Sequence, residues 1–346
     1  MRGVSKYFDG GDTVANYDVS LDVRDGEFLV LLGPSGCGKT TALRQIAGLE
    51  TPSEGQILFD GRDMTDVGPS DRNVAMVFQD YALYPHLTVR ENIEYPLKIR
   101  DVPPEERDER IAETAELLEI EDLLEKDPGE LSGGQRQRTS LARAIVREPS
   151  VFLLDEPLSN LDAKLRRDMR SELKRLQSEL DITTVYVTHN QTEAMSMADR
   201  IAVMNDGTVR QIDDPETLYD QPRSTWVADF IGSPGMNLLA GESSDGTIEL
   251  ETGESLRISS TSTGPVTLGF RPESLSVVAD ASQNGIEGVV DTVEPLGEFT
   301  LVTVDCGTDV LKAKVPETTV ERGDSVKVTF EESDAYVYDE EGILVE

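Results

Sequence analysis

Short runs of β-branched and aliphatic residues recur along the first two thirds of the chain, and most are followed by segments with helical spacing of apolar positions. The runs that predict buried strands are Phe28–Leu32, Val74–Phe78, Val151–Leu154, Thr184–Thr188 and Ile201–Asn205. The segments that predict helices are Lys39–Gly48, Pro104–Leu118, Gly133–Arg147, Asp162–Leu180 and Gln191–Ala198. Strands that alternate with helices predict a mainly parallel sheet with helices on its faces, the α/β class of fold.

Two departures from this alternation suggest how the chain is divided. Two predicted helices, 104–118 and 133–147, follow one another between strands, which indicates a helical subdomain inserted at about residues 80–150. After about Leu239 the pattern changes to short alternating strands between Gly, Pro and Asp turns, namely Val266–Phe270, Gly288–Val293, Thr300–Val304, Val310–Val315 and Ser325–Phe330. We therefore expect an α/β domain over residues 1–235 and a small, barrel-like all-β domain over residues 236–346.

The net charge of the 346-residue chain is −35, from 67 Asp and Glu against 32 Lys and Arg. High net charge with only 5% aromatic residues is also typical of disorder, but the regular apolar runs argue against it. We favour a folded protein that works in a salt-rich cytoplasm over an acidic protein from a cytoplasm of ordinary salt concentration. Near 1 M salt, charges are screened over roughly 3 Å, which removes the repulsion among the acidic side chains. Such a charge also opposes non-specific binding to nucleic acid or anionic lipid.

Cysteine usage and hydropathy indicate where the protein works. The two cysteines, Cys37 and Cys306, provide no disulfide framework, which fits a reducing compartment. The N-terminus lacks the apolar segment of a signal peptide, and no stretch of about 18 apolar residues occurs. We expect a soluble chain, or one held at a membrane by a partner.

A glycine-rich segment follows the first predicted strand and opens a helix. It reads Gly33-Pro34-Ser35-Gly36-Cys37-Gly38-Lys39-Thr40, with Thr41 directly after it, and matches the G-x-x-x-x-G-K-[ST] phosphate loop. Glycines let backbone N–H groups turn towards phosphates, and a helix N-terminus attracts anions. Lys39 would contact the β- and γ-phosphates, and the Thr40 hydroxyl would ligate Mg²⁺. The simpler interpretation, a glycine-rich turn, leaves eight matching positions unexplained.

Two acidic residues end the predicted strand Val151–Leu154. Asp155 would hold Mg²⁺, through water, because this ion keeps part of its hydration shell. Glu156 would act as the base for the attacking water or polarise it. Alone, an Asp-Glu pair after a strand is a common surface feature. It indicates a nucleotide site only in combination with the phosphate loop. Together the two motifs predict a site that binds a nucleotide with Mg²⁺ and activates water to attack its phosphate.

A third motif carries a family resemblance. The segment Leu131-Ser132-Gly133-Gly134-Gln135 is similar to the LSGGQ signature of ATP-binding-cassette (ABC) ATPases, whereas Ser132 alone would be an ordinary helix cap. The resemblance implies that this helix N-terminus, including Gln135, reaches the γ-phosphate of ATP held by the opposite subunit. Two chains would then enclose two nucleotides, as a homodimer or with a paralogous ATPase.

Other segments resemble further elements of that family, in the expected order. Gln79 resembles the glutamine that senses Mg²⁺ and the membrane partner, and Asp162 lies in a segment similar to the loop that crosses the dimer interface. His189 resembles the switch histidine at the γ-phosphate, although an isolated histidine is often structural. Phe8, with Tyr7 as its rival, resembles the aromatic residue that stacks on adenine, although it could also be a core residue.

Five segments narrow the resemblance to the maltose-type carbohydrate importers. They are Tyr81–Leu87, Asn160–Arg166, Phe230–Pro234, Met236–Asn237 and Gly269–Glu273. ATPases of this group carry a C-terminal oligonucleotide-fold-like regulatory domain. The resemblance implies a subunit on the cytoplasmic face of the membrane that drives sugar uptake, of mono- or oligosaccharides with pentoses included. Its partners would be transmembrane permease subunits and, through them, an extracytoplasmic solute-binding protein.

Three departures and two alternatives accompany this resemblance. Because the chain begins close to Val4, we expect part of the first strand to be missing, which affects the adenine side; Asn190 replaces the usual Asp, and Thr40 the commoner Ser. Importers of polyamine, glycerol-phosphate, iron or oxyanion share the architecture and remain alternatives. A non-transport ABC ATPase acting on nucleic acid is a distant alternative, opposed by the negative charge and by the lack of a coiled-coil insertion or second cassette.

Overall fold

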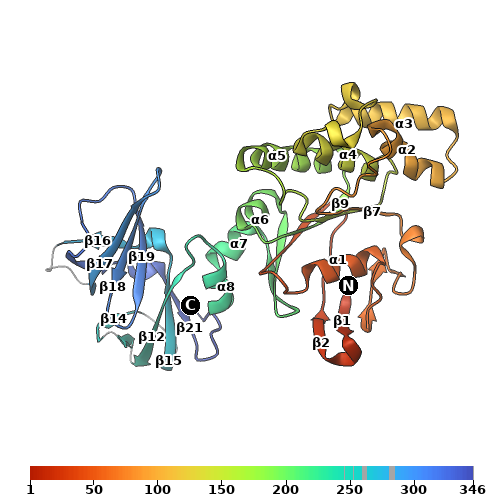
Figure 1. Ribbon diagram of the computed structural model, residues 1–346. Helices are drawn as coiled ribbons and strands as arrows, with labels where there is room; N and C mark the ends of the chain where they lie inside the picture. Colours follow the sequence, from red (N-terminus) through yellow and green to blue (C-terminus); the bar gives the residue numbers. More distant parts are fainter. Residues whose placement is uncertain (245, 252, 259–262, 280–284, 346) are drawn as a thin grey trace. The chain divides into compact units, whose positions relative to one another are not determined.

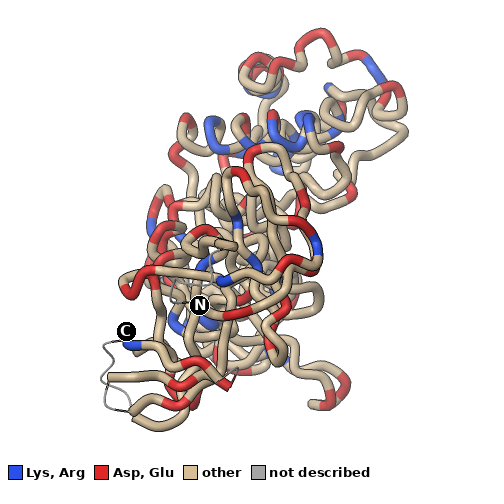
Figure 2. Tube along the Cα trace, turned by 90° about the vertical axis from the view of Figure 1, so that its left-hand side faces the viewer, with Lys and Arg blue, Asp and Glu red and all other residues tan. Residues whose placement is uncertain are grey.

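The computed structural model describes residues 1–244, 246–251, 253–258, 263–279 and 285–345 (Figure 1). By contacts the chain divides into two compact units, Met1–Pro215 and Glu216–Glu346. The sequence pattern predicts a boundary between the α/β domain and the all-β domain at residues 235 and 236, and this boundary stays a prediction. Acidic residues are spread along most of the trace, on helices and loops alike (Figure 2).

The first unit is built on a six-stranded sheet with the order β11-β10-β3-β9-β8-β7. Its strands are β3 (Phe28–Leu32), β7 (Val74–Val77), β8 (Val151–Asp155), β9 (Thr183–Thr188), β10 (Arg200–Asn205) and β11 (Thr208–Asp213). All neighbours pair in parallel except β10 and β11, which form an antiparallel hairpin. β3 is buried at every position, as a strand covered on both faces must be. The predicted α/β core is confirmed.

Helices cover both faces of this sheet. α1 (Lys39–Ala47) lies between the sheet and a smaller antiparallel sheet of β2 (Thr13–Val19), β1 (Arg2–Phe8) and β4 (Glu54–Gln56) (Figure 1). The short β5 (Leu58–Phe59) and β6 (Arg62–Asp63) form a separate hairpin. α6 (Gln191–Met197) packs on β3 and β9, next to α5 (Ala163–Leu180). The strand expected to be incomplete runs from Arg2 and pairs with both β2 and β4.

The predicted helical subdomain is also present and contains a helix that the apolar spacing missed. It consists of α2 (Val89–Ile99), α3 (Pro104–Leu117) and α4 (Gly133–Ile145), with α2 packed on both other helices. The missed helix is α2. Its start is marked by a capping box in which Thr88 accepts from the Glu91 N–H and Glu91 accepts from the Thr88 N–H.

The second unit is an all-β domain preceded by two short helices, α7 (Pro215–Asp220) and α8 (Thr225–Phe230). One antiparallel sheet contains β12 (Asn237–Ser244), β13 (Thr247–Leu250), β14 (Ser255–Arg257), β15 (Gly264–Phe270) and β21 (Ala335–Tyr338). The other contains β16 (Ser276–Val278), β17 (Ile286–Pro295), β18 (Thr300–Asp305), β19 (Val310–Val315) and β20 (Ser325–Thr329). Both sheets contribute to one apolar core that includes Leu268, Phe270, Val302 and Val328. In the part of the chain that the structure describes, no helix has the length and apolarity needed to cross a membrane.

Candidate functional site

The segment Gly33–Gly38 joins β3 to α1 as a loop whose conformation requires glycine. Gly36 and Gly38 have φ angles of +82° and +98°, in the left-handed region. A Cβ atom on Gly33 would lie 2.2 Å from the Met204 carbonyl oxygen, and one on Gly38 would lie 2.2 Å from the Ala15 carbonyl oxygen. The loop is therefore held between β10 and β2. Pro34, Ser35 and Gly36 are exposed at its outer side.

Lys39 places a buried cation inside this loop. Its Nζ atom donates to the carbonyl oxygens of Gly33 and Pro34, both at 2.8 Å, and lies 3.7 Å from the Cys37 sulfur. The residue is only 5% exposed. Burial raises the pKa of the Cys37 thiol, which opposes formation of a thiolate beside the ammonium. A buried ammonium held by neutral carbonyl groups at a helix N-terminus is suited to receiving an anion such as a phosphate.

Thr40 and Asp155 meet at the carboxyl edge of the sheet. Thr40 Oγ1 donates to Asp155 Oδ1 at 3.0 Å, and Asp155 is almost fully buried. Burial raises the pKa of this carboxyl, the Thr40 hydrogen bond lowers it, and the neighbouring Glu156 carboxylate raises it again. A buried carboxylate beside a hydroxyl supplies two oxygen ligands to a hard divalent cation, whose charge would offset the cost of burial. These residues fit Mg²⁺.

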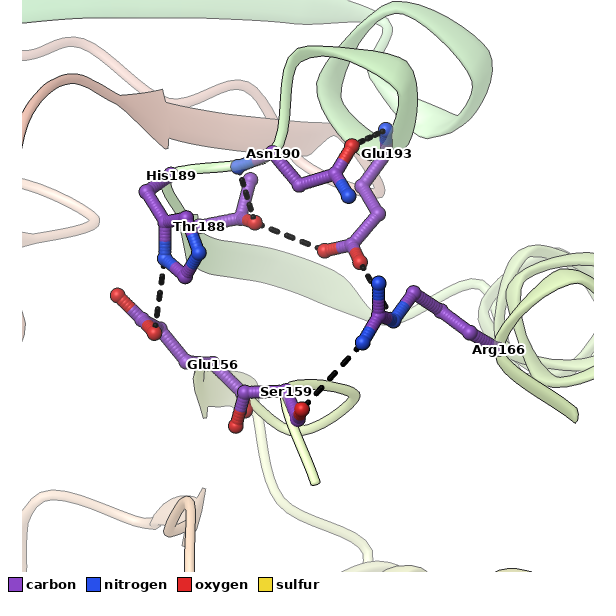
Figure 3. A pocket seen from close by; sticks show the side chains of 7 residues that line it. All are labelled: Glu156, Ser159, Arg166, Thr188, His189, Asn190 and Glu193. Carbon is purple, nitrogen blue, oxygen red and sulfur yellow. Dashed lines mark hydrogen bonds and ion pairs between the residues drawn. The ribbon is translucent and has the colours of Figure 1, made fainter. Parts of the chain in front are cut away.

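Glu156 and His189 face each other in a pocket at the same edge (Figure 3). Nδ1 of His189 lies 3.0 Å from Oε2 of Glu156. The Glu156 backbone has φ +45°, a left-handed conformation that is strained for glutamate, and its N–H donates to the Val187 carbonyl at 3.0 Å. Half of the His189 side chain is exposed, whereas most of the Glu156 side chain is covered. The pair can position a water molecule and accept its proton at Glu156.

The structure brings Lys39, Thr40, Asp155, Glu156 and His189 to one edge of the sheet, and the other predicted site residues belong to separate segments. Gln79 is exposed after β7, and its backbone carbonyl accepts from Asn160 Nδ2 at 3.0 Å. Asp162 caps α5 by accepting from the Lys164 and Leu165 N–H groups. Phe8 ends β1, with the Lys6 ammonium 4.9 Å from its ring centre.

The signature segment forms the start of α4. Ser132 and Gln135 make a reciprocal cap, with the Ser132 hydroxyl accepting from the Gln135 N–H at 3.3 Å. A Cβ on Gly134 would lie 3.0 Å from Leu165 of α5, so this helix passes close to α5. Within the described residues, no hydrogen bond or ion pair joins the signature segment to the nucleotide loop.

The pocket also contains residues to which the sequence assigned no role in the site. Besides Glu156 and His189, it is lined by Ser159, Arg166, Thr188, Asn190 and Glu193 (Figure 3). The Asn190 side chain accepts from the Glu193 N–H at 3.1 Å and so caps α6, a role for which the neutral amide suffices. Glu193 gave no signal and Arg166 appeared only as the last residue of the segment Asn160–Arg166, since charged residues on predicted helices are normally solvated.

Comparisons with known proteins agree with this geometry. Residues 17–159 match the family model described as ABC transporter, and residues 268–337 match the TOBE domain. The trehalose/maltose import ATP-binding protein MalK of Thermococcus litoralis is 49% identical, over 95% of this chain and 94% of its own length. The xylose/arabinose import ATP-binding protein XacJ of Haloferax volcanii is 49% identical, over 96% of this chain and 91% of its own length.

A solved structure shares the fold of the first unit. It is a dimeric ATP-binding cassette in a post-hydrolysis state bound to ADP and Pi, with a TM-score of 0.56 and 34% identity. It covers 62% of this chain, and the match covers 97% of that cassette. Nearly half of the positions are thus identical along almost the entire length of two import ATPases. The chain belongs to the ABC transporter family, as an ATP-hydrolysing, energy-coupling subunit of the import type with a C-terminal TOBE domain.

Proposed function

We propose that this subunit powers the uptake of sugars, as a dimer on the cytoplasmic face of the cell membrane. The observation that carries the catalytic part is the contact between His189 and Glu156, 3.0 Å apart beside the nucleotide loop. Sugar as the cargo is supported by the relatives, whose names assign them trehalose and maltose, or xylose and arabinose. Glycerol-phosphate, polyamine, iron and oxyanion remain the alternative cargoes.

In the proposed chemistry, the predicted site residues bind the nucleotide, hold Mg²⁺ and activate the attacking water. The Gly33–Gly38 N–H groups and Lys39 bind the phosphates, with Thr41 at the loop end and the Phe8 ring against adenine. Thr40, Asp155 and Gln79 would hold Mg²⁺, which neutralises phosphate charge when bound. Glu156 orients the attacking water and accepts its proton, and His189 keeps Glu156 in position and contacts the γ-phosphate.

Dimerisation would complete the site. Ser132, Gly133, Gly134 and Gln135 of one subunit would donate to the γ-phosphate held by the other, and Asp162 would lie at the interface. The dimeric cassette bound to ADP and Pi, similar to the first unit, supports this arrangement. The pairing of two copies or of one copy with a paralogue is open.

Coupling to membrane permease subunits would use the surface around Gln79 and Tyr81–Leu87. Exposed aromatic rings lie on this surface. The ring centres of Tyr84 and Tyr95 are 4.9 Å apart, and both Tyr84 and Phe78 are more than a third exposed. The loop is held by the signature helix α4, because Ser140 and Arg143 donate to the Tyr81 carbonyl oxygen and Arg143 also to that of Ala82. Movement of α4 on ATP binding would therefore carry this surface with it.

The remaining parts of the proposal concern the partner proteins, the TOBE domain and the salt concentration of the cytoplasm. A solute-binding protein would deliver sugar to the permease, and the TOBE domain would regulate the dimer. The net charge of −35 supports work in a salt-rich cytoplasm and opposes a nucleic-acid partner. A relative from Haloferax volcanii supports the same environment.

The test is uptake of a panel of labelled solutes by cells that lack the gene, assayed in high salt, with re-expression of wild-type protein or of the Glu156→Gln variant. The panel contains disaccharides, pentoses, glycerol 3-phosphate and a polyamine. We expect loss of one sugar class, restored by the wild type and not by the variant. Loss restricted to glycerol 3-phosphate or polyamine would replace sugar as the cargo. Full restoration by the variant would contradict the proposed chemistry.

A further inference from the structure

A buried carboxylate lies next to the switch histidine without belonging to the proposed catalytic set. Glu193, in the first turn of α6, is only 4% exposed. Its Oε2 atom accepts from Tyr186 Oη and from Thr188 Oγ1, both at 2.8 Å. Burial, followed by the Glu193 charge, raises the pKa of Tyr186, so the phenol keeps the proton that it donates. Glu193 thus ties α6 to β9 at the residue directly before His189.

The other oxygen of this carboxylate faces an arginine from a different segment. Oε1 of Glu193 lies 3.8 Å from Nε of Arg166, near the start of α5 (Figure 3). The guanidinium also donates to the carbonyl oxygens of Leu158 at 3.3 Å, Ser159 at 3.4 Å and Leu161 at 2.9 Å. One planar cation therefore contacts the 158–161 loop directly and the turn that carries His189 through Glu193. No other side chain in the described part of the pocket makes this bridge.

Each of the two connected segments carries part of the proposed machinery. Thr188 Oγ1 accepts from the Asn190 N–H at 3.0 Å, so the hydroxyl fixed by Glu193 also fixes the backbone on the far side of His189. On the other side, the 158–161 loop leads from Glu156 to Asp162, and the Ser159 hydroxyl donates to the Glu156 carbonyl oxygen at 2.9 Å. The loop expected at the dimer interface and the histidine turn are thus connected by one ion pair, in which Glu193 is buried and the Arg166 side chain is 32% exposed.

We propose that Arg166 and Glu193 are positioning residues that set the His189 side chain against Glu156 according to the position of the 158–161 loop. Neither residue belongs to the proposed catalytic set. Docking of a second subunit would shift the loop and its carbonyl groups, and the guanidinium would pass the shift to Glu193, Thr188 and His189. The inference rests on the proposed function, since it assigns a regulator to the same hydrolytic site.

Conservative substitutions test the pair, because removing the Arg166 guanidinium would leave the buried Glu193 carboxylate uncompensated and could unfold the protein. Glu193→Gln keeps an acceptor for Tyr186 and Thr188 but removes the charge. Arg166→Lys keeps the charge but cannot reach three carbonyl groups and a carboxylate at once. The matched controls are Arg175→Lys and Glu179→Gln, which alter a half-exposed ion pair of 2.8 Å on the same helix.

The first readout is steady-state ATP hydrolysis by the full-length chain in high salt. We expect kcat to fall about 10- to 100-fold in Glu193→Gln and in Arg166→Lys, as when a catalytic group is misplaced. The KM for ATP should stay within about twofold, because the Gly33–Gly38 loop and Lys39, which bind the phosphates in the ground state, are unchanged. The double variant should be no slower than the slower single variant, since both changes break one connection. Both control variants should match the wild type.

The second readout is the imidazole NMR spectrum, which the two histidines of the chain make simple to assign. His86→Gln identifies the His189 signals, and His86 reports on folding because it lies outside this network. We expect the His189 signals to shift in Glu193→Gln and Arg166→Lys and not in the controls, while the His86 signals stay in place.

Unchanged His189 signals in folded variants, or a raised KM at constant kcat, would overturn the inference. If the wild type failed to hydrolyse ATP, the proposed function would fail, and the His189 spectrum would still decide whether the pair positions the imidazole. The two failures are therefore distinguishable.

Discussion

Thr40 Oγ1 donates to Asp155 Oδ1 at 3.0 Å, although 115 positions separate the two residues in the sequence. The contact arises because β3 and β8 are parallel members of one sheet, so the loop that follows β3 and the end of β8 meet at the same edge. It joins the nucleotide loop to the acidic pair. The chain thus places two of the proposed oxygen ligands for Mg²⁺, Thr40 and Asp155, side by side.

Thr40→Val tests this contact. The variant keeps the side-chain shape but removes the hydroxyl, so we expect hydrolysis to fall about 10- to 100-fold and half-saturation to require more Mg²⁺. Thr40→Ser, which keeps the hydroxyl, should remain close to the wild type. The measurement is ATP turnover as a function of Mg²⁺ concentration. Equal Mg²⁺ dependence in the two variants would exclude Thr40 as a ligand.

The glycines of the nucleotide loop allow a paired prediction of stability. Gly36→Ala should cost about 1–2 kcal/mol, because the left-handed φ of +82° is strained for alanine while its Cβ would meet no atom within 4 Å. Gly38→Ala should cost more than about 3 kcal/mol, because overlap with the Ala15 carbonyl oxygen adds to the same strain. Denaturant unfolding without nucleotide measures both. A Gly38 variant as stable as the Gly36 variant would show that the loop relaxes freely away from β2.

Glu172 and Glu119 contact the same arginine, and we expect substitutions of the two to respond to pH with opposite signs. Arg138 lies 2.9 Å from each carboxylate. Burial raises the pKa of Glu172, so the stability from its bound proton is present below the unfolded value of about 4.3 and is lost as pH rises through the folded value. The Arg138 hydrogen bond lowers the pKa of exposed Glu119, whose contribution is present above that value and is lost on acidification.

Urea unfolding between about pH 4 and pH 7 checks these signs. Glu172→Gln should gain stability relative to the wild type as pH rises, because the neutral amide avoids the buried charge. Glu119→Gln should lose stability relative to the wild type over the same range. Shifts of the same sign in the two variants would contradict the assignment of burial and hydrogen bonding as the two causes.

The acidic surface predicts that salt stabilises the fold. Raising KCl from 0.1 M to about 1 M shortens the screening length from about 10 Å to about 3 Å and so weakens repulsion among the 67 acidic side chains. We expect the thermal midpoint to rise through this range. Sucrose, which is excluded from protein surfaces but does not screen charge, serves as the control. A midpoint that is unchanged in KCl would contradict adaptation to a salt-rich cytoplasm.

Much of the fold follows from local sequence patterns, and the misses have identifiable causes. The apolar runs at Phe28–Leu32 and Val151–Leu154 predict buried parallel strands because both faces of such strands are covered. The missed helix α2 contains Pro96 and the exposed Tyr95 and Ile99, which blur its apolar face, although Thr88 and Glu91 carried a capping signal. Strand β11 was also missed, although the hairpin β10–β11 turns at Asp206-Gly207 and an Asp-Gly dipeptide between apolar runs is a typical hairpin signal.

Residues of the site could be predicted only where they belong to short sequence motifs of known chemistry. Lys39, Thr40 and Asp155 lie in such motifs, and the parallel sheet brings them together. Glu193 does not, and Arg166 only ends the segment Asn160–Arg166 with no role assigned to it, because an ion pair between two helices depends on tertiary packing and resembles a solvated helix face in sequence. The left-handed backbone of Glu156 likewise depends on the hydrogen bond of its N–H to Val187.

The most direct test of the account is ATP binding and hydrolysis by Glu156→Gln, with nucleotide affinity and oligomeric state measured on the same sample. The amide keeps the size of the side chain but cannot accept the proton of the attacking water at Glu156. We expect ATP to bind with wild-type affinity, turnover to fall below about 1% of wild type, and a stable dimer to accumulate with ATP. Hydrolysis by Glu156→Gln at the wild-type rate would contradict the central claim that Glu156, held by His189, carries out the chemistry.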